Sequence, residues 1–176
     1  MARQTTSRKV KKLTEILRVV RNAKRRGLKV VTTNGAFDLI HVGHVRNLEF
    51  AKSLGDILIV GVNSDASVRA YKGPKRPIMG EHERAEIVAS LKPVDHVFIF
   101  GDKNPIPWLK KIKPDFHVKG AEWGNAANSK WKIKKVVELP TLKKIGARLV
   151  FAPFFRGRSS TNLIAKITAL CPRGRL

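Results

Sequence analysis

The feature that most constrains this chain is the stretch from Val30 to His44, which reads VVTTNGAFDLIHVGH. Its first four residues, Val30–Thr33, are β-branched, which is typical of a buried strand in a parallel sheet. Asn34-Gly35 breaks this run, because glycine adopts backbone angles that other residues resist. His41 and His44 open an amphipathic segment, and residues three apart share one face of a helix. The stretch therefore predicts a strand, a glycine turn and a helix that begins with two imidazoles.

The junction between this strand and this helix is where open α/β sheets bind ligands. A helix N-terminus there offers unpaired N–H groups and the positive end of the helix dipole to an anion. Spacing alone leaves two alternatives open. An HxxH pair is more often a surface or core pair than a ligand site, and zinc would need further ligands at suitable spacing. Cys171 is the only cysteine and no HExxH occurs, so the junction favours phosphate binding over metal binding.

Strand and helix patterns alternate along the rest of the chain. Further strands are predicted at 56–63, 94–100, 116–119 and 148–151. Helices are predicted at 13–26, at 42–54, as a turn at 66–71, and at 81–91, 106–112, 133–145 and 163–170. Pro140 is expected to interrupt the helix over 133–145. This alternation predicts a Rossmann-like, open, mostly parallel five-stranded α/β sheet with helices on both faces. Neither GxGxxG nor GxxxxGK[ST] occurs, which excludes a dinucleotide fingerprint and a P-loop.

Three further segments could hold phosphates near that edge of the sheet. The first is the loop 72–77, KGPKRP, which combines cations with residues that exclude regular structure, although a disordered basic loop would look the same. Lys119-Gly120 lies at the carboxyl end of the fourth predicted strand. Ser159, Ser160 and Thr161 precede the last predicted helix, where hydroxyls are first of all N-caps and can also bind a phosphate. Trp123 and Trp131 could stack on a base, although tryptophans more often pack in a core.

Composition limits the partners and the compartment. The 176 residues carry 36 Lys+Arg and 13 Asp+Glu, a formal net charge of +23, so a nucleic-acid partner has to be considered. No RNA-recognition signature or aromatic–basic stripe accompanies the charge. Lysines on solvated helix faces, or a substrate with several phosphates, would explain the charge equally well. One cysteine, no long apolar run and no secretory signal predict a cytoplasmic protein without a membrane span. We expect a basic flexible arm over 1–12, one domain over 13–170 and a basic tail over 171–176.

The segment 33–44, TNGAFDLIHVGH, closely resembles the TxGxFDxxHxGH signature of the cytidylyltransferase-like nucleotidyltransferases. The resemblance continues in order through the segments GVNSDASVRAYKGPKRPI, ERAEIVASLKPVDHVFIF, KPDFHVKGAEW and GRSST, and spans most of residues 28–168. Within the family, the chain is most similar to the D-glycero-β-D-manno-heptose 1-phosphate adenylyltransferase group. It departs from that group where Gly120-Ala121-Glu122 replaces a Gly-Gly-Asp-like turn.

The resemblance implies a reaction in which a sugar 1-phosphate and ATP give an ADP-sugar and pyrophosphate. It implies that His41, His44 and Lys72 are catalytic, that Lys72 and Arg84 bind the substrate phosphate, and that Asp38 fixes the histidine loop. The nucleotide-binding residues that it implies are Thr33, Asn34, Gly35, Ala36, Phe37, Gly43, Lys119, Gly120, Glu122, Ser159, Ser160 and Thr161.

The resemblance also implies Mg²⁺ bound with ATP, with no protein ligand assigned to the metal, and a possible homodimer. Two other functions stay open. One is a CTP-dependent cytidylyltransferase that acts on a small alcohol phosphate such as glycerol 3-phosphate. The other is an RNA- or polyanion-binding protein on the same fold, although the charge alone does not favour nucleic acid as the main partner.

Overall fold

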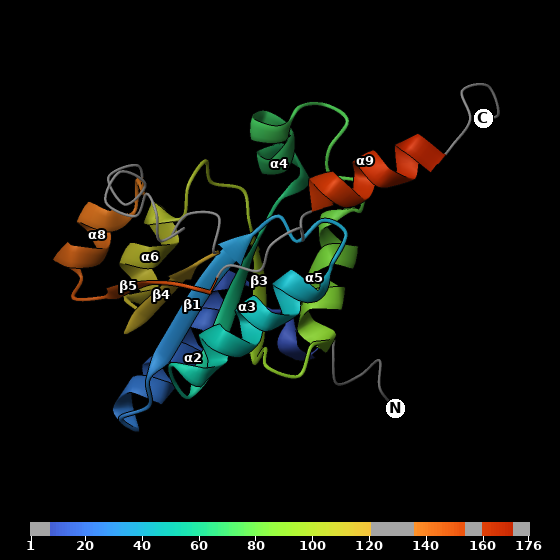
Figure 1. Cartoon of the computed structure of the whole chain (residues 1–176). Coiled ribbons are helices and arrows are strands. Elements are labelled where there is room, and N and C mark those ends of the chain that lie inside the picture. Colours follow the sequence, from blue (N-terminus) through green and yellow to red (C-terminus); the bar gives the residue numbers. More distant parts are fainter. Residues whose placement is uncertain (1–7, 121–135, 154–159, 171–176) are drawn as a thin grey trace.

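The computed structural model describes residues 8–120, 136–153 and 160–170, and Figure 1 shows the arrangement of their elements. Five strands form one sheet in the order β3-β2-β1-β4-β5, and every neighbouring pair is parallel. The strands are β1 (Val30–Gly35), β2 (Ile57–Asn63), β3 (His96–Phe100), β4 (Phe116–Lys119) and β5 (Arg148–Phe151). The predicted five-stranded Rossmann-like sheet is confirmed.

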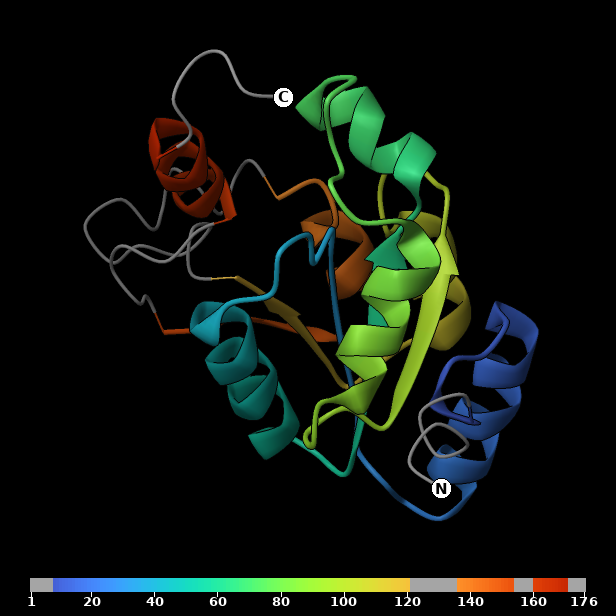
Figure 2. The same ribbon diagram turned by 90° about the vertical axis from the view of Figure 1, so that its right-hand side faces the viewer.

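Helices cover both faces of this sheet. They are α2 (Leu13–Arg25), α3 (Val42–Ser53), α4 (Asp65–Lys72), α5 (Glu81–Ser90), α6 (Ile106–Ile112), α8 (Leu139–Lys144) and α9 (Ser160–Leu170). One core cluster packs α3 and α5 against the sheet, and a second packs α2, α6 and α8. Figure 2 shows α3 and α2 on opposite sides of the strands. The sheet is therefore the middle of three layers.

The central strands β1 and β2 are buried along almost their whole length because helices cover both of their faces. Gly61 in β2 lets two aromatic rings approach the backbone closely. A Cβ at this position would lie 3.2 Å from a ring carbon of Phe100 and 3.3 Å from one of Phe98, closer than ordinary van der Waals contact. The glycine thus allows aromatic packing beneath the helical layer of α2 and α6.

The predicted bounds of one strand and one helix differ from those in the structure. β1 does not end at Thr33: Asn34 and Gly35 continue the ladder opposite Gly61 and Val62. The helix predicted over 133–145 is shorter in the structure: α8 spans Leu139–Lys144, residues 136–138 precede it without forming a helix, and residues 133–135 lie outside the described part of the chain. Pro140 lies in the first turn of α8 and does not interrupt it, because the first N–H groups of a helix need no intrahelical partner.

The predicted flexible arm is anchored to the sheet near its end. The Lys9 ammonium donates to the Val94 carbonyl at 2.7 Å. Val10 forms an isolated parallel β-bridge with Val97, and the Lys11 N–H donates to the Val97 carbonyl at 2.9 Å. The expectation that the whole of 1–12 is free is therefore wrong for residues 9–11, because the edge of β3 offers unpaired backbone groups to this segment. Among the described residues, no helix has both the length and the apolar character needed to cross a bilayer.

Candidate active site

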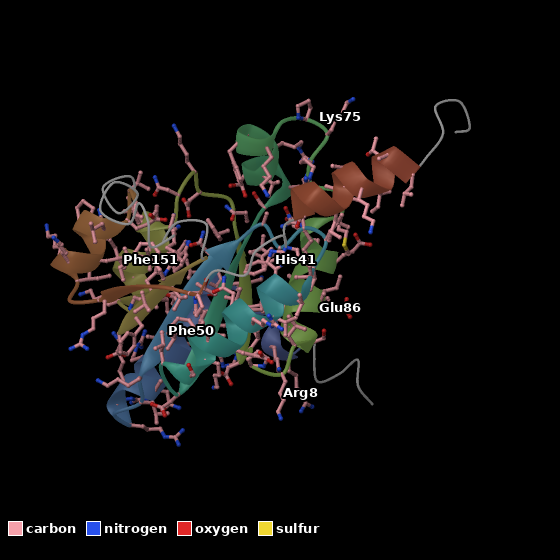
Figure 3. All side chains as sticks on the ribbon, in the orientation of Figure 1. Arg8, His41, Phe50, Lys75, Glu86 and Phe151 are labelled. Atoms are coloured by element: carbon pink, nitrogen blue, oxygen red, sulfur yellow. The ribbon has the colours of Figure 1, made fainter. Side chains whose placement is uncertain are left out.

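The candidate site lies at the carboxyl ends of the strands, where α4, α9 and the loop between α4 and α5 gather above the sheet (Figure 1). Figure 3 shows His41 at this end of the molecule with Lys75 on the loop above it, while Arg8 lies at the opposite end. This is the edge at which open parallel sheets bind ligands.

The two histidines of HxGH share one helix start. His41 is the N-cap of α3, and its Nδ1 accepts the Gly43 N–H at 3.1 Å. The Nδ1 of His44 accepts the His41 N–H at 3.4 Å, and the two ring centroids are 4.0 Å apart. Because each Nδ1 is an acceptor, each neutral ring carries its proton on Nε2. The pair can therefore donate from two adjacent Nε2 atoms to the oxygens of an anion.

The surroundings of His44 keep its ring neutral. Burial lowers the pKa of His44 to about 4, and two electrostatic effects act in the same direction: repulsion from the His41 ring when that ring is also protonated, and the positive charge of Lys72. The Phe37 ring, 5.5 Å from that of His44, forms part of this apolar surrounding. At neutral pH His44 is a hydrogen-bond donor without charge, whereas Lys72, at the exposed end of α4, brings a positive charge to the site.

Asp38 joins the histidine loop to the loop between α4 and α5. Its carboxylate accepts the Arg76 Nε–H at 2.8 Å and the N–H groups of Ile78 at 3.1 Å and Met79 at 3.2 Å. Burial alone would raise the pKa of Asp38, but the two backbone N–H groups and Arg76 outweigh it and hold that pKa below its usual value. This geometry matches the fixing role expected of Asp38.

Ser160, close to the C-terminal end of the sequence, hydrogen-bonds to the backbone of the histidine loop. Its hydroxyl donates to the Asp38 carbonyl, and the Leu39 carbonyl lies 3.3 Å from it. The residue is therefore next to the histidine loop, as predicted, but it donates its proton to the loop backbone. Ser159 and the side chain of Thr161 lie outside the described part of the chain, as do Glu122, Trp123 and Trp131.

The guanidinium of Arg84 has its partners within the protein. Its side chain is fully buried, and it donates to the carbonyls of Met79, Ala36 and Asn63. Its Nη2 also lies 2.6 Å from the Asp65 carboxylate. These bonds use four of the five guanidinium N–H groups of a fully buried side chain, so the structure gives no support to the predicted phosphate contact. Arg84 instead ties the ends of β1 and β2 to α4 and α5.

The predicted nucleotide-binding residues of the first loop divide into two groups. The side chains of Thr33 and Phe37 are turned into the core, and the Thr33 hydroxyl donates to the Val118 carbonyl at 2.9 Å. Any nucleotide contact from these two residues would have to come from the backbone. Asn34, in contrast, has a buried Oδ1 with no hydrogen-bond partner among the described residues, at the end of β1. A ligand N–H or hydroxyl at the edge of the sheet could satisfy this oxygen.

Lys119 has an acidic partner that was not predicted. Its ammonium lies 2.6 Å from the Glu138 carboxylate, and both side chains are nearly buried. The positive charge predicted for the nucleotide is therefore balanced within the protein, next to the half-buried Gly120. A sign of this was present in the sequence, since Glu138 is a lone acid in the apolar run Val-Val-Glu-Leu. Among the described residues, no group of three or more His, Cys, Asp or Glu side chains could hold a metal ion.

Comparison with known sequences identifies the family. The profile of the cytidylyltransferase-like family matches residues 32–166. The chain belongs to this family. It is a nucleotidyltransferase, and its histidine motif lies within the matched region.

The relatives of this cytidylyltransferase-like chain include longer proteins. It is 43% identical over 159 residues to the bifunctional protein HldE of Geobacter metallireducens, and 42% identical over 158 residues to that of Nitratiruptor sp.. Each match covers 90% of this chain but only 31% or 32% of the relative, so the chain spans about a third of their length.

Solved structures show the same fold. The lipopolysaccharide core biosynthesis protein of Thermoplasma volcanium is 27% identical with a TM-score of 0.60, and the match covers 73% of this chain and 99% of that one. A pantoate-beta-alanine ligase from Francisella tularensis is 16% identical with a TM-score of 0.54, over 95% of this chain and 81% of that one. The second likeness concerns the fold alone.

Two neutral histidines should make this nucleotidyltransferase sensitive to mild acid. Burial lowers the pKa of His117 to about 3, aided by Lys119, and that of His44 to about 4, from an ordinary value of 6.5. Between about pH 4 and 6.5 the unfolded chain binds more protons at both residues, so the free energy of unfolding falls as the pH falls. Each histidine contributes at most about 1.4 kcal/mol per pH unit.

Chemical denaturation at pH 7, 6 and 5 would measure this slope. The variant His117→Gln keeps a side chain that can bond Thr32 but cannot titrate, so its stability should fall less steeply with acidification than that of the wild type. Equal slopes in the two proteins would contradict the assignment of His117 as a buried neutral imidazole.

Proposed function

We propose that this nucleotidyltransferase transfers AMP from ATP to a sugar 1-phosphate, D-glycero-β-D-manno-heptose 1-phosphate, and releases pyrophosphate. The observation that carries the proposal is the pair of adjacent Nε2–H donors of His41 and His44, at the N-terminus of α3 and within electrostatic range of Lys72. The similarity to HldE proteins and the heptose-type segments of the sequence support the choice of substrate.

In the proposed reaction, an oxygen of the acceptor phosphate attacks the α-phosphorus of ATP in line. The new P–O bond forms as the bond from the α-phosphorus to the bridging oxygen breaks, and that oxygen leaves with pyrophosphate. No protein nucleophile is needed, so the protein positions the two phosphates and neutralises growing negative charge. Mg²⁺ enters with ATP as part of the substrate.

Each part of the site has a role in this scheme. The Nε2–H groups of His41 and His44 donate to the triphosphate oxygens on which charge increases, and the N-terminus of α3 adds its positive dipole end. Lys72 bridges the two reacting phosphates. Asn34 and Gly120 border the nucleotide at the ends of β1 and β4. Asp38, Arg84 and Ser160 hold the histidine loop and do not touch the substrate.

Pyrophosphate release distinguishes this function from its alternatives. The purified protein with Mg²⁺ is given ATP or CTP, each with heptose 1-phosphate or glycerol 3-phosphate. We expect release only with ATP and the heptose. Release only with CTP and glycerol 3-phosphate would support the alcohol-phosphate cytidylyltransferase and overturn the substrate but not the mechanism. No release from folded protein in all four mixtures would overturn the enzyme itself and favour the polyanion-binding alternative.

We also infer that the protein works in the cytoplasm, where ATP is supplied, and that residues 13–170 form one catalytic domain. The homodimer that the resemblance implies stays a prediction, which light scattering of the purified protein would test.

A further inference from the structure

The two helical layers of the sheet differ strongly in charge. The layer of α2, α6 and α8 carries eight Lys and Arg residues, four in α2 and two in each of the other helices, and one acid, Glu15. The eight cations are Arg18, Arg21, Lys24, Arg25, Lys110, Lys111, Lys143 and Lys144. The layer of α3 and α5 carries four acids, Glu49, Glu81, Glu83 and Glu86. The layer of α3 and α5 also carries three cations, Arg46, Lys52 and Arg84, so the helices of the first layer have a net charge of +7 and those of the second a net charge of −1.

These eight cations lie on three neighbouring helices, and we call the surface that they share the basic helical face. All eight residues are exposed. The three helices are neighbours, because α2 packs against α6, α6 packs against α8, and one core cluster joins them to the sheet. The Lys24 ammonium donates to the Lys113 carbonyl. The other seven side chains have no hydrogen bond or ion pair with any part of the chain that the structure describes.

The basic helical face is separate from the candidate active site. His41, His44 and Lys72 belong to α3 and α4 and lie at the carboxyl ends of the strands, whereas α2 covers the sheet from the opposite side to α3 (Figure 2). A substrate with several phosphates at the active site therefore does not account for this charge. Like charges at this density repel one another and attract a polyanion.

The chemistry of the face favours the backbone of a duplex over other polyanions. Single strands are held by exposed aromatic rings between the cations. The exposed large hydrophobic residues of the described chain include none on α2 or α6, and only Val137 lies beside α8. An interfacial membrane helix inserts its apolar side into lipid, but that side of α2, with Ile16, Val20 and Ala23, is buried against the sheet. Arginine, which dominates α2, suits bidentate contacts with phosphate.

We propose that the basic helical face binds the phosphate backbone of double-helical nucleic acid without reading its sequence. Binding of this kind releases counterions, so the affinity falls steeply with salt, with a slope of about −0.9 in log K against log salt for each phosphate contacted. The surface would act independently of the transferase site.

The test compares two triple variants that lose the same charge. The first, R18Q/R25Q/K143Q, removes cations of the basic helical face. The control, R8Q/K92Q/K103Q, removes exposed cations outside it. Fluorescence anisotropy with a 20-base-pair DNA duplex between 50 and 200 mM salt gives the affinity and its slope. We expect micromolar binding by the wild type at low salt, at least tenfold weaker binding and a slope shallower by about 2 to 3 in the first variant, and little change in the control.

Several outcomes would overturn the proposal. Equal losses in both variants would mean diffuse attraction without a defined face. Single-stranded DNA of the same length that binds as tightly as the duplex would exclude backbone geometry as the basis. Stronger binding to vesicles with anionic phospholipids than to the duplex, at the same salt, would assign the face to a membrane surface. Pyrophosphate release should be the same in all three proteins, because none of the six residues belongs to the active site.

Discussion

Replacing His44 with alanine is expected to lower kcat/KM for pyrophosphate release by about 10²–10³-fold while the protein stays folded. The loss corresponds to about 3–4 kcal/mol of transition-state stabilisation, which is typical for the removal of one positioned donor. The reason is structural: the Nδ1 of His44 is held by the His41 N–H, and this fixes the proton on Nε2. Alanine removes the Nε2–H donor and also releases the His41 backbone N–H that the ring accepts.

Steady-state kinetics with ATP and the heptose phosphate would measure the effect, with circular dichroism to confirm the fold. His82→Ala is the matched control, because His82 is an exposed histidine on α5. His44→Gln, whose side-chain amide can still donate, should recover part of the loss. A folded His44→Ala protein with wild-type kinetics would remove the histidine pair from the mechanism.

Replacing Arg84 with methionine is expected to lower the free energy of unfolding by about 3–5 kcal/mol. Methionine fills a similar length of the buried space but leaves the Asp65 carboxylate and the carbonyls of Ala36 and Asn63 without their donor. Removing one partner of a buried ion pair destabilises a protein by about this much, because the remaining charge is still desolvated but is no longer paired. Activity should fall as well, because the Ala36 carbonyl belongs to the histidine loop.

Urea denaturation separates this role from the phosphate-binding role that the sequence suggested. Arg21→Met, on the exposed side of α2, is the control and should change stability by less than about 0.5 kcal/mol. If Arg84 bound the acceptor phosphate, the variant would be as stable as the wild type and would show a raised KM for the acceptor. That result would contradict the structural role.

The sequence allowed most of the fold to be predicted, because the local patterns are strong. β5 and α6 have the predicted bounds, and β-branched runs located β1 and β2 to within two residues. The wrong predictions concern glycine and proline, which sequence rules treat as the ends of strands and helices although the backbone can accommodate both within them. Gly35 stays in a paired strand, and Pro140 lies in the first turn of a helix that was predicted to be interrupted at this residue.

The candidate site was predictable only in part, because the sequence does not show which residue a charged side chain will pair with in the folded protein. The histidine pair is a local feature of one helix start and could be found from spacing. Arg84 and Lys119 looked equally suited to phosphates, yet each meets an acid within the fold, Asp65 and Glu138. Those pairs form between segments 19 residues apart, and only the tertiary structure brings them together.

The bracing of the histidine loop has a consequence for the order in which the protein matures on the ribosome. Both strands that pair with β1, β2 and β4, are available once β4 has been synthesised. Ser160, whose hydroxyl donates to the Asp38 carbonyl, lies 122 residues after Asp38 in the chain. Contacts of such long range form late, because the chain between them must first be ordered. We therefore expect a nascent chain that ends after β5 to hold a folded sheet with loosely held histidines, so that catalytic competence would follow folding as a separate, later event in synthesis.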